Sequence, residues 1–365
     1  MTTKDCTVGS VYRRFKPHIL MVLTQIGYTF LYFITQASFN HGMNPHVYMT
    51  YRHIVAALVM LPFAYFLERK VRPKLTIALF AEIFVLSLLG VGLTLNMYFA
   101  SLRYTSPTFL ASMVNTVASL TFLIAIALRL ETLDFCKPRG AAKVMGTIIS
   151  LAGVTTMTLY KGYALRNLWH PLISIQGRSM FHEDWIKGSI LIVASCITWS
   201  MWYIMQAFTL KRYPAQISLT VWMSFIGAAQ SAVFAAFVEN KLAAWKIGFN
   251  IDMWSTIYGG VICSGLIIFI QLWVTEEKGP VFVTMFNPLS TILVSVIAYF
   301  ILGEKLYVGS IIGGVVVILG LYLLLWGKEE DQEAKVILEE PYASHEETKA
   351  FKVHRFSSDG KEEYP

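Results

Sequence analysis

Charged residues are scarce in this chain of 365 residues, because they make up only 15% of it while 55% is hydrophobic. Soluble domains are nearer a quarter charged. The acidic residues are also gathered at one end: 11 of the 23 lie between Gly327 and Pro365. A bilayer requires long apolar runs separated by short charged segments. The sequence therefore predicts an all-α integral membrane protein.

Motifs of several other protein classes are missing as well. No G-x-x-x-x-G-K-[ST] loop occurs, so ATP does not drive this chain directly. No H-E-x-x-H, no G-x-S-x-G and no pair of aspartates falls within an apolar run, and we predict neither an enzyme nor a cofactor. His46 and His53 have no evident partner, which predicts a surface or interfacial role for both.

Metal and nucleic-acid sites are excluded on similar grounds. The cysteines at 6, 136, 196 and 263 are too far apart for a metal or redox motif. The net charge is +7, but the lysines and arginines lie in short loops rather than along one stripe. We therefore predict no metal site and no nucleic acid as a partner.

Apolar runs of about 20 residues are long enough to cross a bilayer. The segment 1–17 is predicted to be a cytosolic N-terminus, 161–187 an extracytosolic loop, and 327–365 a disordered acidic cytosolic tail. In that tail, Glu333 to Leu338 imperfectly resembles a dileucine sorting signal, so trafficking adaptors are candidate partners. Ten membrane spans are predicted, at 18–37, 47–67, 77–101, 108–128, 141–160, 188–209, 217–237, 254–274, 281–302 and 308–326.

The distribution of lysine and arginine predicts how these spans are oriented. With the N-terminus inside, the inner segments hold 21 basic residues and the outer segments hold 8. Without the tail the ratio is still 15 to 8. Cytoplasmic loops carry the excess of positive charge, so both termini are predicted to be cytosolic.

The chain also contains an internal repeat. A shift of 173 residues places Ser106–Phe109 on Gly279–Phe282 and Leu130–Leu133 on Gly303–Leu306. The repeats are predicted to cover 18–160 and 188–326, and each has five spans, so the two have opposite orientations. Inverted repeats of this kind hold a site near the membrane midplane in transporters. In the fifth helix of each repeat, Gly146 and Gly153 correspond to Gly313 and Gly320, at a shift of 167 residues.

The stretches 43–76, 104–131, 151–162 and 279–328 resemble the plant Walls-Are-Thin-related, nodulin-like branch of the drug/metabolite transporter superfamily. This branch is also called the usually-multiple-acids-move-in-and-out transporters. The resemblance implies ten helices, a central pathway, and facilitated or bidirectional movement of amino acids or the auxin indole-3-acetic acid. It implies the plasma membrane or the tonoplast, and we expect the plasma membrane. The sequence departs from the family pattern at Ala118, often proline, and at Leu95, often glutamine.

Two polar stripes within the spans are candidate pathway linings. Side chains in hydrocarbon that are polar tend to pair, pack or line a pathway, and helix–helix contact is the other interpretation. Pro288 is predicted to kink the second of these helices. The stripes are Thr108, Ser112, Asn115 and Ser119 in the fourth span, and Thr284, Asn287, Thr291 and Ser295 in the ninth.

Other polar or aromatic residues within spans are further candidates. Gln25 and Asn96 either line the pathway or bond between helices. Trp199 is a candidate wall for a solute, whereas Trp202 is predicted to pack in the core. Arg52 either extends to the headgroups or anchors a solute carboxylate. Gln206, Gln230 and Gln271 are weaker candidates.

These observations predict a carrier of small organic solutes that works by facilitated, bidirectional alternating access. A neutral polar cavity with aromatic walls suits amino acids, and auxin or a related organic acid is the alternative. No cluster of Asp, Glu or His lies in mid-membrane to form a proton relay, although Glu82 leaves weak proton linkage open. From another class, a non-transporting receptor or scaffold is the competing hypothesis.

Overall fold

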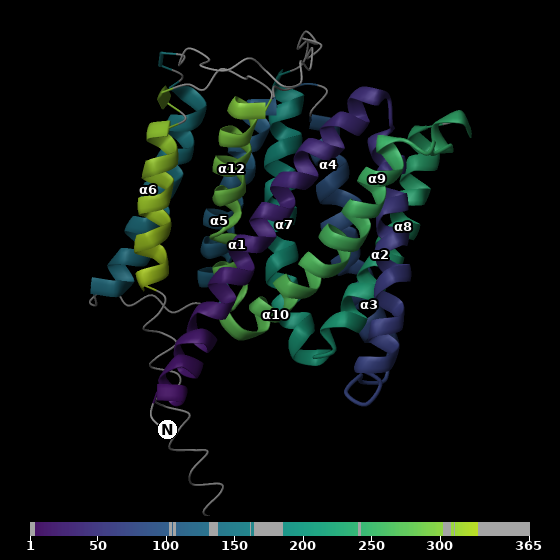
Figure 1. The fold of residues 1–365 in the computed structure, drawn as a ribbon, viewed down its shortest axis with the longest axis horizontal. Helices are drawn as coiled ribbons and strands as arrows, with labels where there is room; N and C mark the ends of the chain where they lie inside the picture. The colour runs from purple at the N-terminus through teal and green to yellow at the C-terminus, as the bar shows by residue number, and fades with distance from the viewer. Residues whose placement is uncertain are drawn as a thin grey trace, which may run out of the picture.

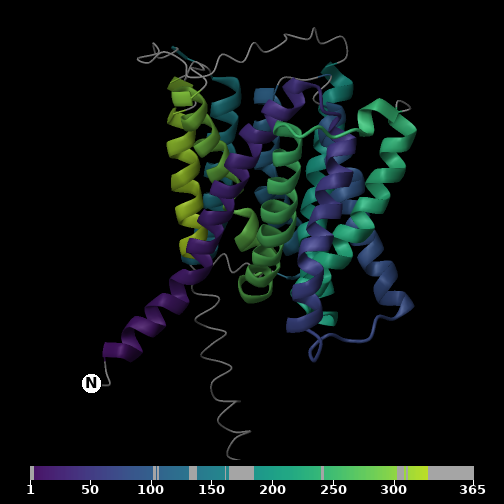
Figure 2. The same cartoon turned by 45° about the vertical axis from the view of Figure 1, so that its right-hand side comes forward.

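The computed structural model describes residues 4–101, 104, 107–130, 138–160, 162–163, 185–239, 242–301, 308–309 and 311–327. Within these ranges the regular structure is entirely helical, and most helices run along a common direction as a bundle (Figure 1). Figure 2 shows that the N-terminal part of α1 projects from one end of this bundle. The predicted cytosolic tail and most of the predicted 161–187 loop lie outside the described residues.

Each long apolar run forms a helix. Two of the runs contain a π-helical segment, η1 or η3, between two α-helical parts, and one is divided into α11 and α12. The elements are α1 (Lys4–His41), α2 (Pro45–Leu67), α3 (Ile77–Ser87), η1 (Leu88–Leu95), α4 (Asn96–Ser101), α5 (Pro107–Ala127), α6 (Pro138–Leu159), α7 (Trp185–Arg212), α8 (Gln216–Val238), η2 (Leu242–Trp245), α9 (Ile251–Tyr258), η3 (Gly259–Ile267), α10 (Ile268–Lys278), α11 (Pro280–Thr284) and α12 (Asn287–Ile301), followed by a helix at Ile311–Gly327.

Membrane-spanning character is clear for most of these helices. Among the described residues, seven helices are long and apolar enough to cross a membrane, and Met113–Ala127 and Ile311–Gly327 are shorter apolar helices. The chain is therefore a multi-pass membrane protein. The count of ten spans in two repeats stays a prediction. The seven are Phe15–Phe39, Pro45–Leu67, Ile77–Tyr98, Ile186–Arg212, Gln216–Val238, Ile251–Lys278 and Pro280–Ile297.

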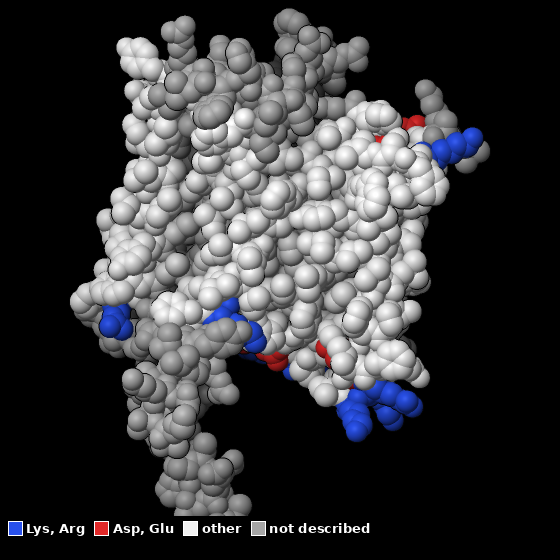
Figure 3. All heavy atoms as spheres, in the orientation of Figure 1, with Lys and Arg blue, Asp and Glu red and all other residues white. Residues whose placement is uncertain are grey.

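Basic side chains gather at the end of the bundle where α2 leads to α3 and α7 leads to α8 (Figure 3). Arg69, Lys70, Lys211 and Arg212 are exposed there. This is the end that the count of lysine and arginine predicts to be cytosolic. The N-terminus lies at the same end (Figure 1).

Helix α8 is capped by a residue of another helix. The two carboxylate oxygens of Glu68, at the C-terminal end of α2, accept hydrogen bonds from the backbone N–H groups of Ile217 (2.8 Å) and Ser218 (2.6 Å). The first N–H groups of a helix have no partner within the helix, and a negative charge is favourable beside them. Glu68 therefore fixes the start of α8 to the end of α2.

Replacing Glu68 with alanine is expected to destabilise the protein by roughly 1–2 kcal/mol, the range for losing a helix cap. The measurement is the thermal unfolding midpoint of the purified protein in detergent. Glu277→Ala is the control, because Glu277 is an exposed carboxylate at the same end of the bundle. If both variants have the same unfolding midpoint, the Glu68 cap contributes nothing to the stability of the protein.

The two π-helical segments occupy corresponding positions of the predicted repeats. A shift of 173 residues moves η1, residues 88–95, to 261–268, which overlaps η3 at 259–267. Single π-helical turns are rare and occur often at functional sites. Their placement supports the alignment of the third span with the eighth.

Helix α6 packs against the helix at 311–327 through glycines. A Cβ atom added at Gly146 would lie 2.6 Å from the carbonyl oxygen of Gly320, and one at Gly153 would lie 2.8 Å from that of Gly313. Backbones approach this closely only where side chains are absent. If the two predicted repeats are exchanged, the Gly146–Gly320 contact becomes the Gly313–Gly153 contact, and the reverse. An approximate two-fold axis between the repeats would require this.

Candidate functional site

The predicted kink at Pro288 is a complete interruption of the helix. Helix α11 ends at Thr284, Met285 and Phe286 form a turn, and α12 begins at Asn287 with Pro288 in its first turn. Proline has no N–H group and fits the first turn of a helix well. The hydroxyl of Thr284 is buried and donates to the carbonyl oxygen of Val281 (2.9 Å), so it is used within its own helix.

The two polar stripes meet at one point. The Thr291 hydroxyl donates to Oδ1 of the buried Asn115 (2.9 Å), which joins α12 to α5. Ser295, one turn further along α12, donates to the backbone oxygen of Thr291. The side chains of Thr108 and Ser112 lie outside the described residues. The stripes therefore face each other, as a pathway lining or a helix contact both require.

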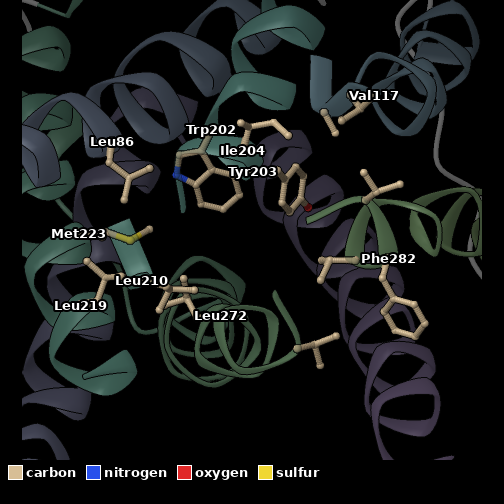
Figure 4. Close-up of a cluster of buried hydrophobic side chains, with 14 of the residues drawn as sticks. Leu86, Val117, Trp202, Tyr203, Ile204, Leu210, Leu219, Met223, Leu272 and Phe282 are labelled. Carbon is tan, nitrogen blue, oxygen red and sulfur yellow. The ribbon is translucent and has the colours of Figure 1, made fainter. Parts of the chain in front are cut away.

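A second group of polar side chains surrounds the hydroxyl of Tyr203 in α7. The side chains of Asn287, Gln271 and Trp199 lie beside this hydroxyl. Figure 4 shows that the Tyr203 ring lies next to Trp202 and Ile204, with its oxygen towards the α11–α12 region. Asn287 and Trp199, both predicted from the sequence, are thus brought together around a tyrosine that was not predicted.

Helix α1 contributes Gln25 and Tyr28 to the same region. Tyr28 lies beside Gln271 and close to Tyr203. Gln25 is three residues before Tyr28, so both lie on one face of α1. Gln25 is buried, and its Nε2 has no hydrogen-bond partner among the described residues. Tyrosines in the middle of spans, away from the interfacial belts, were the signal in the sequence that could have found Tyr28 and Tyr203.

Arg52 is buried inside the bundle, which favours an inward-facing cation over extension to the headgroups. Its Nε donates to the hydroxyl of Ser264 (2.7 Å) and to the carbonyl oxygen of Gly259 (3.1 Å), both in η3. The Tyr48 and Tyr28 hydroxyls lie close enough to Arg52 to interact electrostatically with its guanidinium. In the part of the chain that the structure describes, no carboxylate pairs with Arg52.

Asn96 does not belong to the polar side chains around Tyr203 and Arg52, because its amide makes hydrogen bonds elsewhere. Its Oδ1 is 2.7 Å from Nδ1 of His46, and its Nδ2 donates to the carbonyl oxygen of Gly92 (2.6 Å). The structure thus places Asn96 in a bond between α4 and α2, which was one of the two open interpretations. The surface role predicted for His46 and His53 is wrong, since both are buried; Nδ1 of His53 lies 2.8 Å from the carbonyl oxygen of Met49.

Three further candidates, Trp202, Glu82 and Gln230, make contacts outside this group, whereas Gln206 is buried with neither end of its amide hydrogen-bonded to a described residue. Trp202 is buried in the apolar core, as predicted, with its ring against Gly90. Glu82 accepts hydrogen bonds from Thr209 (2.8 Å) and from Arg212 (2.9 Å) at the basic end of the bundle. Gln230 donates to the carbonyl oxygen of Phe84 (3.2 Å). These contacts of Glu82 and Gln230 involve none of the side chains named around Tyr203 and Arg52.

Comparison with known proteins agrees with this architecture. The model of the EamA-like transporter family matches residues 15–159 and again 186–326. A solved structure whose title names no activity superposes with a TM-score of 0.62 at 16% identity, covering 85% of this chain and 98% of that one. That likeness shows the fold alone.

Curated plant proteins are similar over nearly the whole chain. A WAT1-related protein of Arabidopsis thaliana is 38% identical over 334 residues, 90% of each chain, and another is 40% identical over 324 residues, 88% of this chain and 87% of the relative. An auxin-induced protein of Pinus taeda is 38% identical over 331 residues, 87% of this chain and 80% of the relative. The chain therefore belongs to the EamA-like transporter family and, within it, to the plant WAT1-related proteins.

Proposed function

We propose that this protein carries small organic solutes, amino acids first, in both directions across the plasma membrane by alternating access between two inverted five-helix repeats. The family model matches the chain twice, once in each half. The corresponding positions of η1 and η3 and the exchangeable glycine contacts of α6 also support two repeats. The basic end of the bundle is the cytosolic end in this proposal, with both termini there.

One observation carries the proposal: Arg52 is a buried cation that no carboxylate of the described residues neutralises. A charge within a membrane is costly, and such residues usually face a cavity or a partner. Amino acids and indole-3-acetic acid share a carboxylate, which a guanidinium binds with short, charge-assisted hydrogen bonds. A bound solute would therefore supply the missing negative charge.

The proposed site extends from Arg52 to the groups around Tyr203. It contains Gln25 from α1, Trp199 from α7, and Asn287 with Pro288 at the interruption between α11 and α12. Asn115 reaches it through Thr291. Asn96 is excluded because both ends of its amide are bonded elsewhere.

Auxin is the second candidate solute, because the indole ring of Trp199 and the phenol rings of Tyr28 and Tyr203 offer flat aromatic walls. The name of the Pinus taeda relative refers to induction by auxin and does not say what that protein carries. Competition between labelled amino acids and indole-3-acetic acid at one carrier would show which of the two candidate solutes binds more tightly.

The test is to express the chain in oocytes and to measure uptake and efflux of labelled amino acids and indole-3-acetic acid, with and without a proton gradient. We expect movement of at least one solute in both directions, with weak dependence on the gradient. If no tested solute moves although the protein is at the cell surface, the receptor or scaffold hypothesis takes its place.

Asn115→Ala and Asn287→Ala are each expected to reduce flux by about tenfold, the effect of one lost hydrogen bond of about 1.4 kcal/mol. Surface abundance should be unchanged. Asn96→Ala is the contrasting variant, because its loss breaks the contact with His46 and should lower the amount of folded protein instead. Wild-type flux in both Asn115→Ala and Asn287→Ala would remove these residues from the pathway.

A further inference from the structure

Gln271 in α10 is a buried amide whose polar atoms are not paired at normal hydrogen-bond geometry with any described residue. Its side chain is 0% exposed, and neither Nε2 nor Oε1 makes a hydrogen bond of normal geometry with any described residue. A buried polar group left without a partner costs about 1–3 kcal/mol. Such groups in folded proteins therefore call for an explanation, such as a ligand that completes their hydrogen bonds.

The surroundings of Gln271 bring several polar side chains together within the apolar core. The hydroxyls of Tyr28 and Tyr203 lie beside its amide, and the side chain of Asn287 also lies beside the Tyr203 hydroxyl. These four side chains come from α1, α7, α10 and α12. Together they gather several hydrogen-bond donors and acceptors, one side chain from the first half of the chain and three from the second.

The cation at Arg52 is close to this point but separate from it. Arg52 bonds to Ser264, which is seven residues before Gln271 along the continuous η3–α10 helix. At about 1.5 Å per residue, those seven residues span roughly 10 Å along the helix axis. Both side chains converge on Tyr28, which lies beside Gln271 and within reach of the charge of Arg52.

We propose that Gln271 is a specificity-determining residue, which binds a neutral hydrogen-bonding group of the same solute whose carboxylate pairs with Arg52. The substrate class is then a carboxylate with a second donor or acceptor, such as an amide, a hydroxyl or a ring N–H, at a distance from the carboxylate. Acids that are apolar beyond the carboxylate are poor substrates. This inference rests on the proposed function and specifies which solutes the same site selects.

The physical reason is that a buried amide costs free energy when its hydrogen bonds are left unmade, and a solute that makes them removes this cost. A site built to hydrogen-bond a solute rejects an analogue without that group strongly, because the buried polar side chain is left unpaired. An apolar pocket discriminates far less between the same two solutes. Replacing Gln271 with leucine should therefore remove the selectivity while leaving room for both members of a pair.

The experiment uses two pairs of solutes that differ mainly in the hydrogen-bonding group: glutamine with norleucine, and indole-3-acetate with naphthalene-1-acetate. Initial flux of each labelled solute is measured for the full chain, for Gln271→Leu, and for Gln230→Leu as the control. Gln230 is also a glutamine within a span, but it bonds to Phe84 in α3. Gln271→Met, which is close to glutamine in volume, is measured in parallel in case the leucine variant does not fold.

In at least one pair, the wild type and Gln230→Leu are expected to favour the hydrogen-bonding member by about tenfold or more. Gln271→Leu or Gln271→Met should bring that ratio near one, mainly by slowing the favoured solute. A wild-type ratio near one in both pairs would overturn the inference, as would an unchanged ratio in a Gln271 variant that transports. If the wild type moves none of these four solutes but does move another amino acid in the flux test above, this inference is overturned and the proposed function stands; if it moves no solute in either test, both fail.

Discussion

Arg52→Leu is expected to reduce the flux of carboxylate solutes by about 100-fold, because truncating one partner of a buried charge pair costs about 2–5 kcal/mol. Arg52 is buried, and its Nε is held by Ser264 and Gly259 of η3. These contacts hold the guanidinium in place, so the proposed solute would meet a cation that is already oriented. Arg52→Lys keeps the charge but not the planar fork, and it should retain an intermediate flux.

The measurement is initial uptake of labelled solute, divided by the amount of carrier at the cell surface. Arg72→Leu is the control, because Arg72 is an exposed cation in the connection between α2 and α3, at the basic end of the bundle. Its flux should equal that of the wild type. If Arg52→Leu transports as fast as Arg72→Leu, Arg52 does not bind the solute.

Gly146→Ala is expected to destabilise the protein by about 3 kcal/mol, at the upper end of the usual effect of overpacking. The added Cβ would lie 2.6 Å from the carbonyl oxygen of Gly320 and 2.7 Å from the backbone nitrogen of Leu324. Both neighbours are backbone atoms, so neither moves away without separating α6 from the helix at 311–327. The readout is the thermal unfolding midpoint in detergent, together with the yield of monodisperse protein.

Gly314→Ala is the matched control for this change. Its added Cβ would meet only the Cγ1 atom of Ile292, at 3.7 Å, which is an ordinary contact. Alanine is favoured over glycine in a helix by about 1 kcal/mol, so Gly314→Ala should be neutral or stabilising. Similar midpoints for the two variants would contradict the close backbone contact.

The helices were predictable because a bilayer leaves few alternatives. Apolar runs of about 20 residues must satisfy their backbone hydrogen bonds internally, and α2 and α8 follow the predicted 47–67 and 217–237 closely. The meeting of Asn115 with Thr291 was also accessible, since residues spaced by whole turns share one helix face. Both inferences need only periodicity and length.

The environment of Arg52 was not accessible in this way. Whether an arginine near a span end extends outward or turns inward depends on what the neighbouring helix offers. Here the π-helical η3 offers the carbonyl of Gly259 and the hydroxyl of Ser264. A π-helical segment has no reliable sequence signature, so neither η3 nor its partner Arg52 could be placed from the chain alone.

The buried histidines show the same limit. His46 follows the first proline of α2 and looked like an interfacial residue, but Asn96 of α4 lies 2.7 Å away and makes burial favourable. The mid-span position of Tyr28 and Tyr203 is only a weak signal, because aromatic residues are common in every span. Their importance depends on Gln271 and Asn287, which are far from them in the sequence.

The central claim is that the solute site is exposed to one side of the membrane at a time. Counterflow in proteoliposomes tests this claim most directly. Vesicles containing the purified chain are loaded with an unlabelled solute, diluted into a trace of the same labelled solute, and held at equal pH and ionic composition on both sides. A carrier with one alternating site predicts transient accumulation of label above equilibrium in loaded vesicles and none in empty ones. Equal label in loaded and empty vesicles, for amino acids and indole-3-acetate alike, would contradict the account.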